Sequence, residues 1–254
     1  MPTLLLLRHG QSAWNAAGRF AGWVDVDLTP DGEQRAHRAG RLLADAGLLP
    51  TVLHTSLLTR SAWTGAITVT AAGRAWLPVH RSWRLNERCY GALEGHQRSA
   101  VRAEHGDERY RAWRRSYDVA PPPRSPAAHA ELLCDPRYRD LSPEQTPRTE
   151  SLADVVSRLL PHWEQVLVPQ LRAGQVPLVV GHSNSLRALV SHLDAMTPDE
   201  VPHLNVPTGM PLVYELDDDL VPVVRGGRYL EPEAAARAAA EVAAQGGDSG
   251  SPPS

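Results

Sequence analysis

Short apolar runs alternate with longer amphipathic stretches along most of this chain. The runs Leu4–Leu7 and Val176–Gly181 are too short for independent helices and almost wholly apolar, so they predict buried strands. The same reasoning predicts further short strands at residues 51–53, 77–79, 211–216 and 220–224, the last two near an edge of the sheet.

Helical periodicity fills the segments between these strands. Thr29-Pro30 is a typical N-cap followed by a first-turn proline, and Gly47 fits a helix terminator. Apolar residues recur at helical spacing between them. Further helices are expected around Arg60, at 151–171 with a bend at Pro161, and at 186–193.

Strands that alternate with helices predict an α/β fold, a three-layer α/β/α sandwich with a mainly parallel sheet. We expect one catalytic domain over residues 1–230. Residues 95–150 are charged and rich in proline, and they break the alternation, which favours a cover over a functional site. Beyond Glu231 an alanine-rich stretch predicts one helix, and from Gly246 onward the composition predicts disorder.

Composition removes several classes of function. With a net charge of −3, the chain lacks the overall positive field that would attract nucleic acid or an anionic membrane. All 26 cationic side chains are arginine, so Schiff-base and P-loop lysines are excluded. The spacing of Cys89 and Cys134 suggests neither a metal site nor a disulfide framework. With no predicted signal peptide or membrane span, we expect a cytoplasmic protein.

Candidate chemistry begins directly after the first predicted strand, at Arg8-His9-Gly10. In open parallel sheets, ligands bind beyond the carboxyl ends of the strands. Arginine grips phosphate bidentately, and a neutral imidazole can attack phosphorus. The alternative is an ordinary polar turn, and the tripeptide alone does not choose between the two.

A second strand ends in the same way. Residues 178–180 are followed by Gly181-His182-Ser183-Asn184-Ser185 and a predicted helix, whose N-terminus attracts anions. Taken alone, His182 is more often a capping or core histidine. Its pairing with Arg8-His9 favours two imidazoles around one phosphoryl group.

Three further groups are ambiguous when each is considered alone. Arg60 fits a solvated helix arginine, and the paired Arg114 and Arg115 fit either a solvated face or a grip on carboxylate or phosphate. Glu87, between apolar and glycine-containing turns, is a candidate general acid/base.

These residues belong to a wider pattern. The chain resembles the cofactor-dependent phosphoglycerate mutases of the histidine phosphatase superfamily from about Leu4 to Tyr229. Arg-His-Gly alone indicates only the superfamily, and the long cover segment with its paired arginines points to the mutase branch. The resemblance is carried by these motifs: RHGQSAWN (8–15), GWVDVDLT (22–29), LNER (85–88), YGALEG (90–95), HGDE (105–108), WRRSYD (113–118), DPRY (135–138), TESL (149–152), NSLRALV (184–190) and NVPTGMPLVYE (205–215).

The resemblance implies a role for each matching residue. His9 carries the phosphoryl group as phosphohistidine, Arg8, Arg60 and His182 surround that group, and Glu87 exchanges a proton with the substrate hydroxyl. The residues implied to hold the substrate are Gln11, Ser12, Asn15, Ala21, Gly22, Arg88, Cys89, Tyr90, Arg98, Arg114, Arg115, Ser183 and Asn184. The family is primed by 2,3-bisphosphoglycerate, binds no metal, and is commonly a homodimer or homotetramer.

Four substrate-holding positions depart from the family pattern. Ala21 stands where threonine is usual, Cys89 replaces a histidine, Arg98 replaces a lysine, and Ser183 replaces a glycine. Gln11 in place of glutamate is a milder change. The phosphoryl-transfer residues are all present.

Three functions therefore remain to be distinguished. The first is a mutase that interconverts 3- and 2-phosphoglycerate. The second is a phosphatase for a small phosphorylated acid, in which the altered shell admits water to phosphohistidine. The third, a non-catalytic phospho-ligand sensor, is disfavoured because His9, Glu87 and His182 are all retained.

Overall fold

The computed structural model describes residues 1–244, and in this part of the chain six strands form one sheet. The strand order is β3-β2-β4-β1-β5-β6. The strands β3, β2, β4 and β1 are parallel, β5 is antiparallel to β1, and β6 is antiparallel to β5. The bounds are β1 Thr3–Arg8, β2 Val52–Thr55, β3 Val79–Arg81, β4 Pro177–Gly181, β5 Leu212–Glu215 and β6 Arg228–Tyr229.

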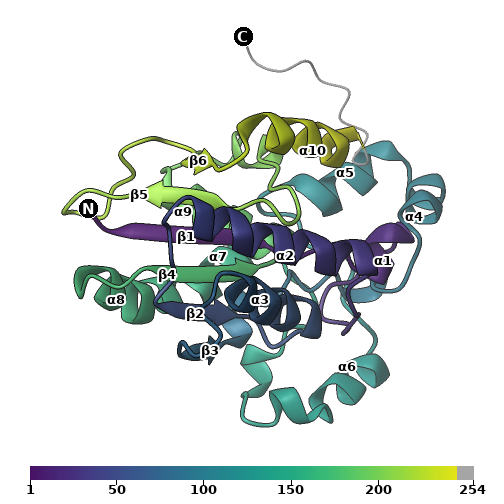
Figure 1. Ribbon diagram of the computed structural model, residues 1–254. Helices are drawn as coiled ribbons and strands as arrows, with labels where there is room; N and C mark the ends of the chain where they lie inside the picture. The colour runs from purple at the N-terminus through teal and green to yellow at the C-terminus, as the bar shows by residue number, and fades with distance from the viewer. Residues whose placement is uncertain (245–254) are drawn as a thin grey trace.

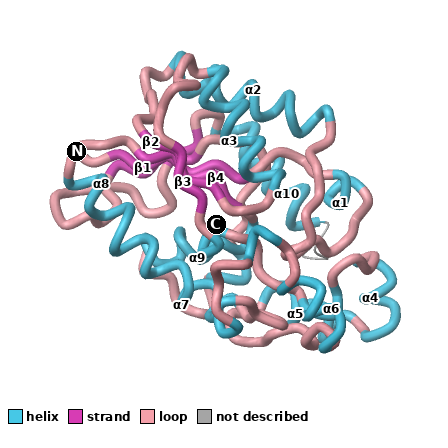
Figure 2. The backbone as a smooth tube through the Cα atoms, turned by 90° about the horizontal axis from the view of Figure 1, so that it is seen from below, coloured by secondary structure: helices cyan, strands magenta, loops and turns pink. Residues whose placement is uncertain are grey.

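Helices cover both faces of this sheet (Figures 1 and 2). One face carries α2 and α3, and the other carries α7, α8 and α9. The predicted α/β/α sandwich with a mainly parallel sheet is therefore confirmed. The bounds are α1 Ala13–Ala16, α2 Pro30–Asp45, α3 Thr59–Ala71, α4 Arg98–His105, α5 Asp107–Arg115, α6 Pro126–Leu133, α7 Leu152–His162, α8 Val168–Arg172, α9 Ser183–Leu193 and α10 Pro232–Ala244.

The central strand β1 connects the two cores. Successive side chains of a strand point to opposite faces, so its four buried leucines divide between the layers. Leu4 and Leu6 pack with residues of α7 and α9, while Leu5 and Leu7 pack with residues of α2 and α3. This double burial explains why the strand is a continuous apolar run instead of an alternating one.

Three predicted elements differ from the structure for reasons that involve proline. The strand expected at 77–79 begins at Val79, because Pro78 has no N–H and Leu77 is buried in the core before it. The strand expected at 220–224 is absent from the described chain. Leu220 has a φ of +63°, Pro222 makes only a single bridge to Leu216, and the edge strand is β6.

The helix expected at 151–171 is divided into three parts. A π-helical turn at Trp163–Leu167 separates α7 from α8. It lies between Pro161 and Pro169, whose missing N–H groups interrupt the regular hydrogen-bond ladder. The bend predicted at Pro161 therefore takes the form of a widened turn just after it.

The segment predicted to be a cover contains α4, α5 and α6. Helices α4 and α5 are neighbours beyond one end of the sheet, whereas α6 lies apart from them (Figure 1). The predicted alanine-rich helix is α10, whereas the predicted disorder from Gly246 lies outside the described residues. The division into a 1–230 catalytic domain and a terminal segment stays a prediction. Within residues 1–244, no helix combines the length and apolar character required to cross a bilayer.

Three histidines meet where β2, β3 and α7 pack together. The His54 ring stacks on His80 at 5.1 Å between centroids and lies edge-on to His162 at 5.3 Å. His54 Nε2 donates a hydrogen bond to Gln170 Oε1 at 2.7 Å. Burial lowers the pKa of His54 and of His162 to about 4, and nearby cationic or histidine side chains add to the effect.

These two buried histidines make folding sensitive to acid. Between pH 6.5 and about 4, these histidines are protonated in the unfolded chain but stay neutral in the folded protein. The free energy of unfolding therefore falls as pH falls. We expect a loss on the order of 3 kcal/mol from each histidine across that range. Urea midpoints at pH 7.5 and 5 measure the part of this loss that falls above pH 5, and His162→Gln should reduce the difference. Equal pH dependence in the variant would contradict this account.

Candidate active site

The carboxyl ends of β1 and β4 bring two histidines together. The strands are adjacent and parallel, with Arg8 opposite Gly181, and the residue that follows each strand is a histidine. The His9 N–H donates to Gly181 O at 3.0 Å, which continues the pairing into the loop. The ring centroids of His9 and His182 are 4.9 Å apart. This distance is about one inter-strand spacing, so the backbone itself sets the separation of the imidazoles.

Hydrogen bonding fixes the protonation state of His9. Its Nδ1 lies 2.7 Å from Gly10 O, and because a carbonyl only accepts, Nδ1 carries the proton. The Nε2 lone pair is therefore available. Burial, with Arg60 and Arg8 nearby, holds the pKa of His9 well below its usual 6.5, which keeps the ring neutral. No residue larger than glycine fits at position 10, because a Cβ on Gly10 would lie 2.2 Å from Gly32 O.

Two arginines flank the histidine pair, Arg60 fully buried and Arg8 partly buried. Arg60 donates to Val24 O at 2.9 Å and to Gly22 O at 2.8 Å, which fixes the loop before α2 against α3. Arg8 donates to Val206 O at 2.7 Å. Burial lowers the pKa of Arg8 only to about 10, so its guanidinium stays charged at neutral pH. Two fixed cations beside two neutral imidazoles form a site suited to a phosphoryl group.

His182 is fully buried at the N-terminus of α9, where it is the N-cap residue. Its Nε2 lies 2.7 Å from the Ser56 hydroxyl, at the end of β2. Burial lowers the pKa of His182 far below 6.5, and the charge of Arg60 adds to this effect. A third strand thus contributes to the same site.

Glu87 faces the same space from the loop after β3. One carboxylate oxygen, Oε1, accepts hydrogen bonds from the Arg88 N–H at 2.8 Å and from the Asn184 N–H and side-chain amide at 3.0 Å each. The Asn184 amide also donates to the Tyr90 hydroxyl at 3.0 Å. These bonds occupy one oxygen and hold the carboxylate in a single orientation.

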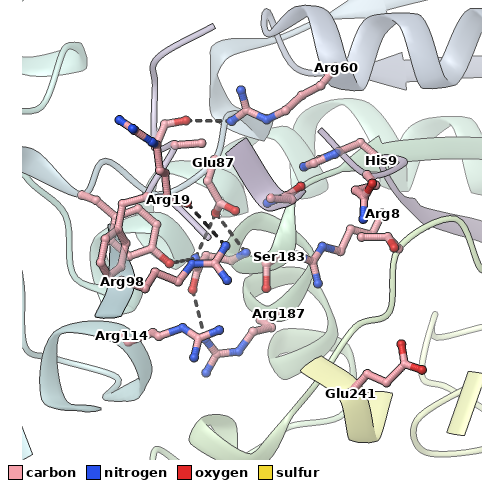
Figure 3. Close-up of a pocket in the computed structure, with 18 of the residues that line it drawn as sticks. Arg8, His9, Arg19, Arg60, Glu87, Arg98, Arg114, Ser183, Arg187 and Glu241 are labelled. Carbon is pink, nitrogen blue, oxygen red and sulfur yellow. Dashed lines mark hydrogen bonds between the residues drawn. The ribbon is translucent and has the colours of Figure 1, made fainter. Parts of the chain in front are cut away.

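Arg8, His9, Arg60 and Glu87 line one cavity of about 150 Å³ (Figure 3), whereas the fully buried His182 and Ser56 are not among its lining residues. Eight arginines and two glutamates line it, so its electrostatic character is strongly cationic. The arginines are Arg8, Arg19, Arg35, Arg60, Arg98, Arg114, Arg115 and Arg187, and the glutamates are Glu87 and Glu241. A small ligand with several negative charges is the matching occupant. Among the described residues, no group of histidine, cysteine and carboxylate side chains is arranged to hold a metal ion.

Most of the residues predicted to hold a substrate are in the wall of this cavity. Those present are Gln11, Asn15, Ala21, Gly22, Tyr90, Arg98, Arg114, Arg115, Ser183 and Asn184. Arg98 and the arginine pair come from α4 and α5, which are consecutive helices in the N-terminal part of the predicted cover. The cover segment therefore contributes directly to the cationic wall.

Three predicted substrate-holding residues lie behind the wall. The Ser12 hydroxyl caps α1 by accepting from the Asn15 N–H at 3.2 Å. Arg88 is fully buried, donates to the carbonyls of Trp113 and Arg114, and stacks on Tyr90. In these positions Ser12 and Arg88 support neighbours that do line the cavity.

Cys89 is the third of these residues and is also fully buried. It packs between Trp23 and Tyr138, and its thiol donates to Pro147 O at 3.4 Å. Burial raises the pKa of the thiol, and nearby Glu94 raises it further. The departure from histidine at this position therefore changes packing behind the cavity and not its lining.

Sequence reasoning missed several lining residues. They are Arg19, Phe20, Arg35, Arg187, Thr208, Ala238 and Glu241. Arg187 had a usable signal, because it follows Asn184 by three positions on the same helix and donates to the Asn184 side-chain oxygen at 3.0 Å. Ala238 and Glu241 lie on α10, in a segment whose composition carries no sign of a site.

Comparison with known proteins places this geometry in context. The family model described as "Histidine phosphatase superfamily (branch 1)" matches residues 4–134 and 124–225. The chain is 56% identical over 246 residues to a 2,3-bisphosphoglycerate-dependent phosphoglycerate mutase of Thermobifida fusca, covering 97% of this chain and all of that one. Proteins with the same name from Streptomyces avermitilis (53% identical, 96% of each chain) and Mycobacterium tuberculosis (54%, covering 96% of this chain and 97% of that one) are similar over the same range.

Solved structures share the fold at lower sequence identity. A mycobacterial glucosyl-3-phosphoglycerate phosphatase has a TM-score of 0.66 at 23% identity, covering 85% of this chain and 93% of its own. Bacillus stearothermophilus YhfR has a TM-score of 0.67 at 22% identity, covering 90% and 98%.

Proposed function

This chain belongs to the histidine phosphatase superfamily, and we propose that it is a 2,3-bisphosphoglycerate-dependent phosphoglycerate mutase. It interconverts 3-phosphoglycerate and 2-phosphoglycerate through phosphohistidine at His9. The relatives that are 53–56% identical over nearly the whole chain bear that name. The observation that carries the mechanism is the His9–His182 pair, 4.9 Å apart between fixed arginines.

His9 acts as the nucleophile. Its Nε2 lone pair attacks the phosphorus of a bound phosphate ester, so that an N–P bond forms as the P–O bond breaks. Arg8, Arg60 and His182 stabilise the charge that develops on the three equatorial oxygens. The neutrality of His9, maintained by burial beside two cations, keeps this lone pair available at physiological pH.

Glu87 transfers the proton that this exchange requires. When the ester bond breaks, the carboxyl group gives its proton to the leaving oxygen. In the return step the carboxylate takes the proton from the hydroxyl that attacks phosphohistidine, and the N–P bond breaks. Within the described residues, the N–H groups of Arg88 and Asn184 bind Oε1, which leaves the other carboxylate oxygen available for this transfer.

The cationic wall fits the primer that the proposed mutase reaction requires. 2,3-Bisphosphoglycerate, when bound, supplies the phosphoryl group that first charges His9. Arg98, Arg114 and Arg115 would hold its distal phosphate and carboxylate, with Asn15, Gly22 and Tyr90 completing the wall. We propose that the arginines neutralise the anion in place of a metal, and that Ala21, Arg98 and Ser183 adjust how the ligand is held.

Assembly and location follow from the same proposal. We infer a homodimer or homotetramer in the cytoplasm, acting on a small phosphorylated substrate and on neither nucleic acid nor membrane. Trp76 and Val79, just before and at the start of the edge strand β3, expose apolar side chains that would suit contact between copies.

A primed isomerisation assay tests the function. Purified protein should convert 3-phosphoglycerate to 2-phosphoglycerate only after addition of catalytic 2,3-bisphosphoglycerate, and excess EDTA should leave the rate unchanged. Inorganic phosphate measured in parallel should appear far more slowly. Release of phosphate faster than isomerisation would reject the mutase in favour of a phosphatase, and loss of activity in EDTA would reject the metal-free mechanism.

A further inference from the structure

Ser56 is a buried hydroxyl without a role in the chemistry described above. We propose that Ser56 is a positioning residue that fixes His182 as the Nδ1–H tautomer, making the second imidazole a hydrogen-bond donor to the transferred phosphoryl group. The inference rests on the proposed function for its consequence in catalysis, but the tautomer itself is independent of the substrate.

The sheet places Ser56 directly beside His182. Strands β2 and β4 are parallel neighbours with Thr55 opposite Val180, so both strands end at the same edge of the sheet. Ser56 is the first residue after β2 and is fully buried. Its hydroxyl oxygen lies 2.7 Å from His182 Nε2.

Counting protons assigns the direction of this hydrogen bond. The Ser56 oxygen already accepts the Leu58 N–H at 3.1 Å, and the hydroxyl has a single proton to donate. Within the described chain, His182 Nε2 is the acceptor in reach of that proton. If Nε2 were protonated, the Ser56 proton would lack an acceptor in a buried site. The favoured arrangement is therefore Ser56 as donor, a bare Nε2, and a proton on Nδ1.

The remaining ring nitrogen needs a partner from outside the protein. His182 Nδ1 is buried and, within the described part of the chain, makes no hydrogen bond; the Ser185 N–H faces the ring in the capping box of α9 but forms no side-chain cap hydrogen bond with it. The ring lies edge-on to His9, at 61° between planes and 4.9 Å between centroids. A phosphoryl oxygen held at His9 would satisfy Nδ1–H, which is the role expected of a donor at this position.

Ser56 is itself held firmly enough to impose this choice. Its N–H donates to Ser61 Oγ at 3.2 Å, and Ser61 Oγ donates to Val180 O at 2.7 Å. The Thr55 hydroxyl donates to the Ser56 carbonyl at 3.0 Å. The Ser56 backbone is thus tied, through Ser61, to β4, the strand that directly precedes His182.

The two imidazoles consequently have different tautomers. His9 donates through Nδ1 to a backbone carbonyl, which leaves a lone pair on Nε2 for attack. His182 accepts at Nε2 from a hydroxyl, which leaves an N–H to stabilise charge. One neutral ring becomes a nucleophile and the other a donor because their partners differ.

Nitrogen NMR of the whole protein, labelled with [¹⁵N]histidine, tests the assignment without any substrate. His182→Gln identifies the His182 signals. We expect protonated Nδ1 and bare Nε2 in the wild type, and a shift toward the Nε2–H form in Ser56→Ala. The matched control is Ser191→Ala, which removes another buried hydroxyl from contact with α9 backbone but does not touch the ring.

Kinetics provide the second readout. Ser56→Ala should lower kcat about 10- to 100-fold with KM changed less than about twofold, because Ser56 acts on His182 and not on substrate. Ser56→Thr, which keeps the hydroxyl, should restore most of kcat and the wild-type tautomer. A wild-type Nε2–H signal, or an unchanged His182 tautomer in folded Ser56→Ala, would overturn the proposal. The expected tautomers in a protein without mutase activity would instead reject the proposed function alone.

Discussion

Replacement of His9 by asparagine is expected to abolish isomerisation, with a loss of about 10⁴-fold or more. The amide has no lone pair able to form the N–P bond, so neither transfer step can begin. The remaining arginines and His182 would still bind the anionic ligand, because none of them depends on the His9 side chain for its backbone contacts. Binding and chemistry should therefore separate in this variant.

Transfer of label from ³²P-labelled primer to protein measures the first step directly. Wild-type protein should acquire one acid-labile, base-stable phosphate, and His9→Asn should acquire none. His37→Asn is the matched control, because His37 is an exposed histidine on α2 and should label normally. Turnover or stable labelling in His9→Asn would disprove covalent transfer through His9.

Replacement of Glu87 by glutamine is expected to lower kcat for isomerisation by about 10²- to 10⁴-fold. Glutamine keeps an oxygen that can accept the N–H groups of Arg88 and Asn184, so the loop should retain its conformation. It cannot release or take up the proton that the glycerate hydroxyl exchanges. The loss should therefore appear in kcat, with KM nearly unchanged.

An aryl phosphate with an acidic leaving group separates this role from a structural one. Its leaving oxygen needs no proton, so phosphorylation of His9 by that donor should be much less impaired in Glu87→Gln than phosphorylation by the natural primer. Glu164→Gln, at an exposed position remote from the cavity, serves as the control. An equal loss with both donors would assign Glu87 to structure and not to proton transfer.

The elements that place the histidine pair could be predicted from sequence, for a physical reason. A strand buried on both faces must be apolar throughout, so Leu4–Leu7 and Leu178–Val180 stand out from the amphipathic helices around them. The polar residue after such a run lies at the carboxyl edge of the sheet. His9 and His182 could therefore be located before any coordinates, although only the pairing of β1 with β4 makes them neighbours.

Contacts that depend on side-chain packing could not be read from the chain. The Ser56 hydroxyl and the His182 ring are 126 positions apart, and no periodicity links them. Cys89 directly precedes the wall residue Tyr90 in sequence, yet it packs toward Trp23 while Tyr90 lines the cavity. The direction of a side chain in an irregular loop follows from the backbone of that loop, which local sequence does not specify.

The edge strand β6 shows the same limit on a smaller scale. Apolar content favoured residues 220–224, but Val221, Val223 and Val224 are each more than half exposed. The strand that forms, Arg228–Tyr229, contains two residues and pairs with β5 through Leu212 and Val213. Such a short element is determined by the partner available at the edge and not by its own composition.

The pairing of β1 with β4 has a consequence for protein engineering. The spacing of the two rings is encoded in main-chain hydrogen bonds, while several of the residues that we propose hold the substrate come from α4, α5 and the first turn of α9. Libraries confined to those peripheral positions should yield catalysts with altered selectivity that still form the covalent intermediate. Changing which molecule accepts the phosphoryl group, without altering the residues that form the covalent intermediate, is therefore a realistic design goal for this scaffold.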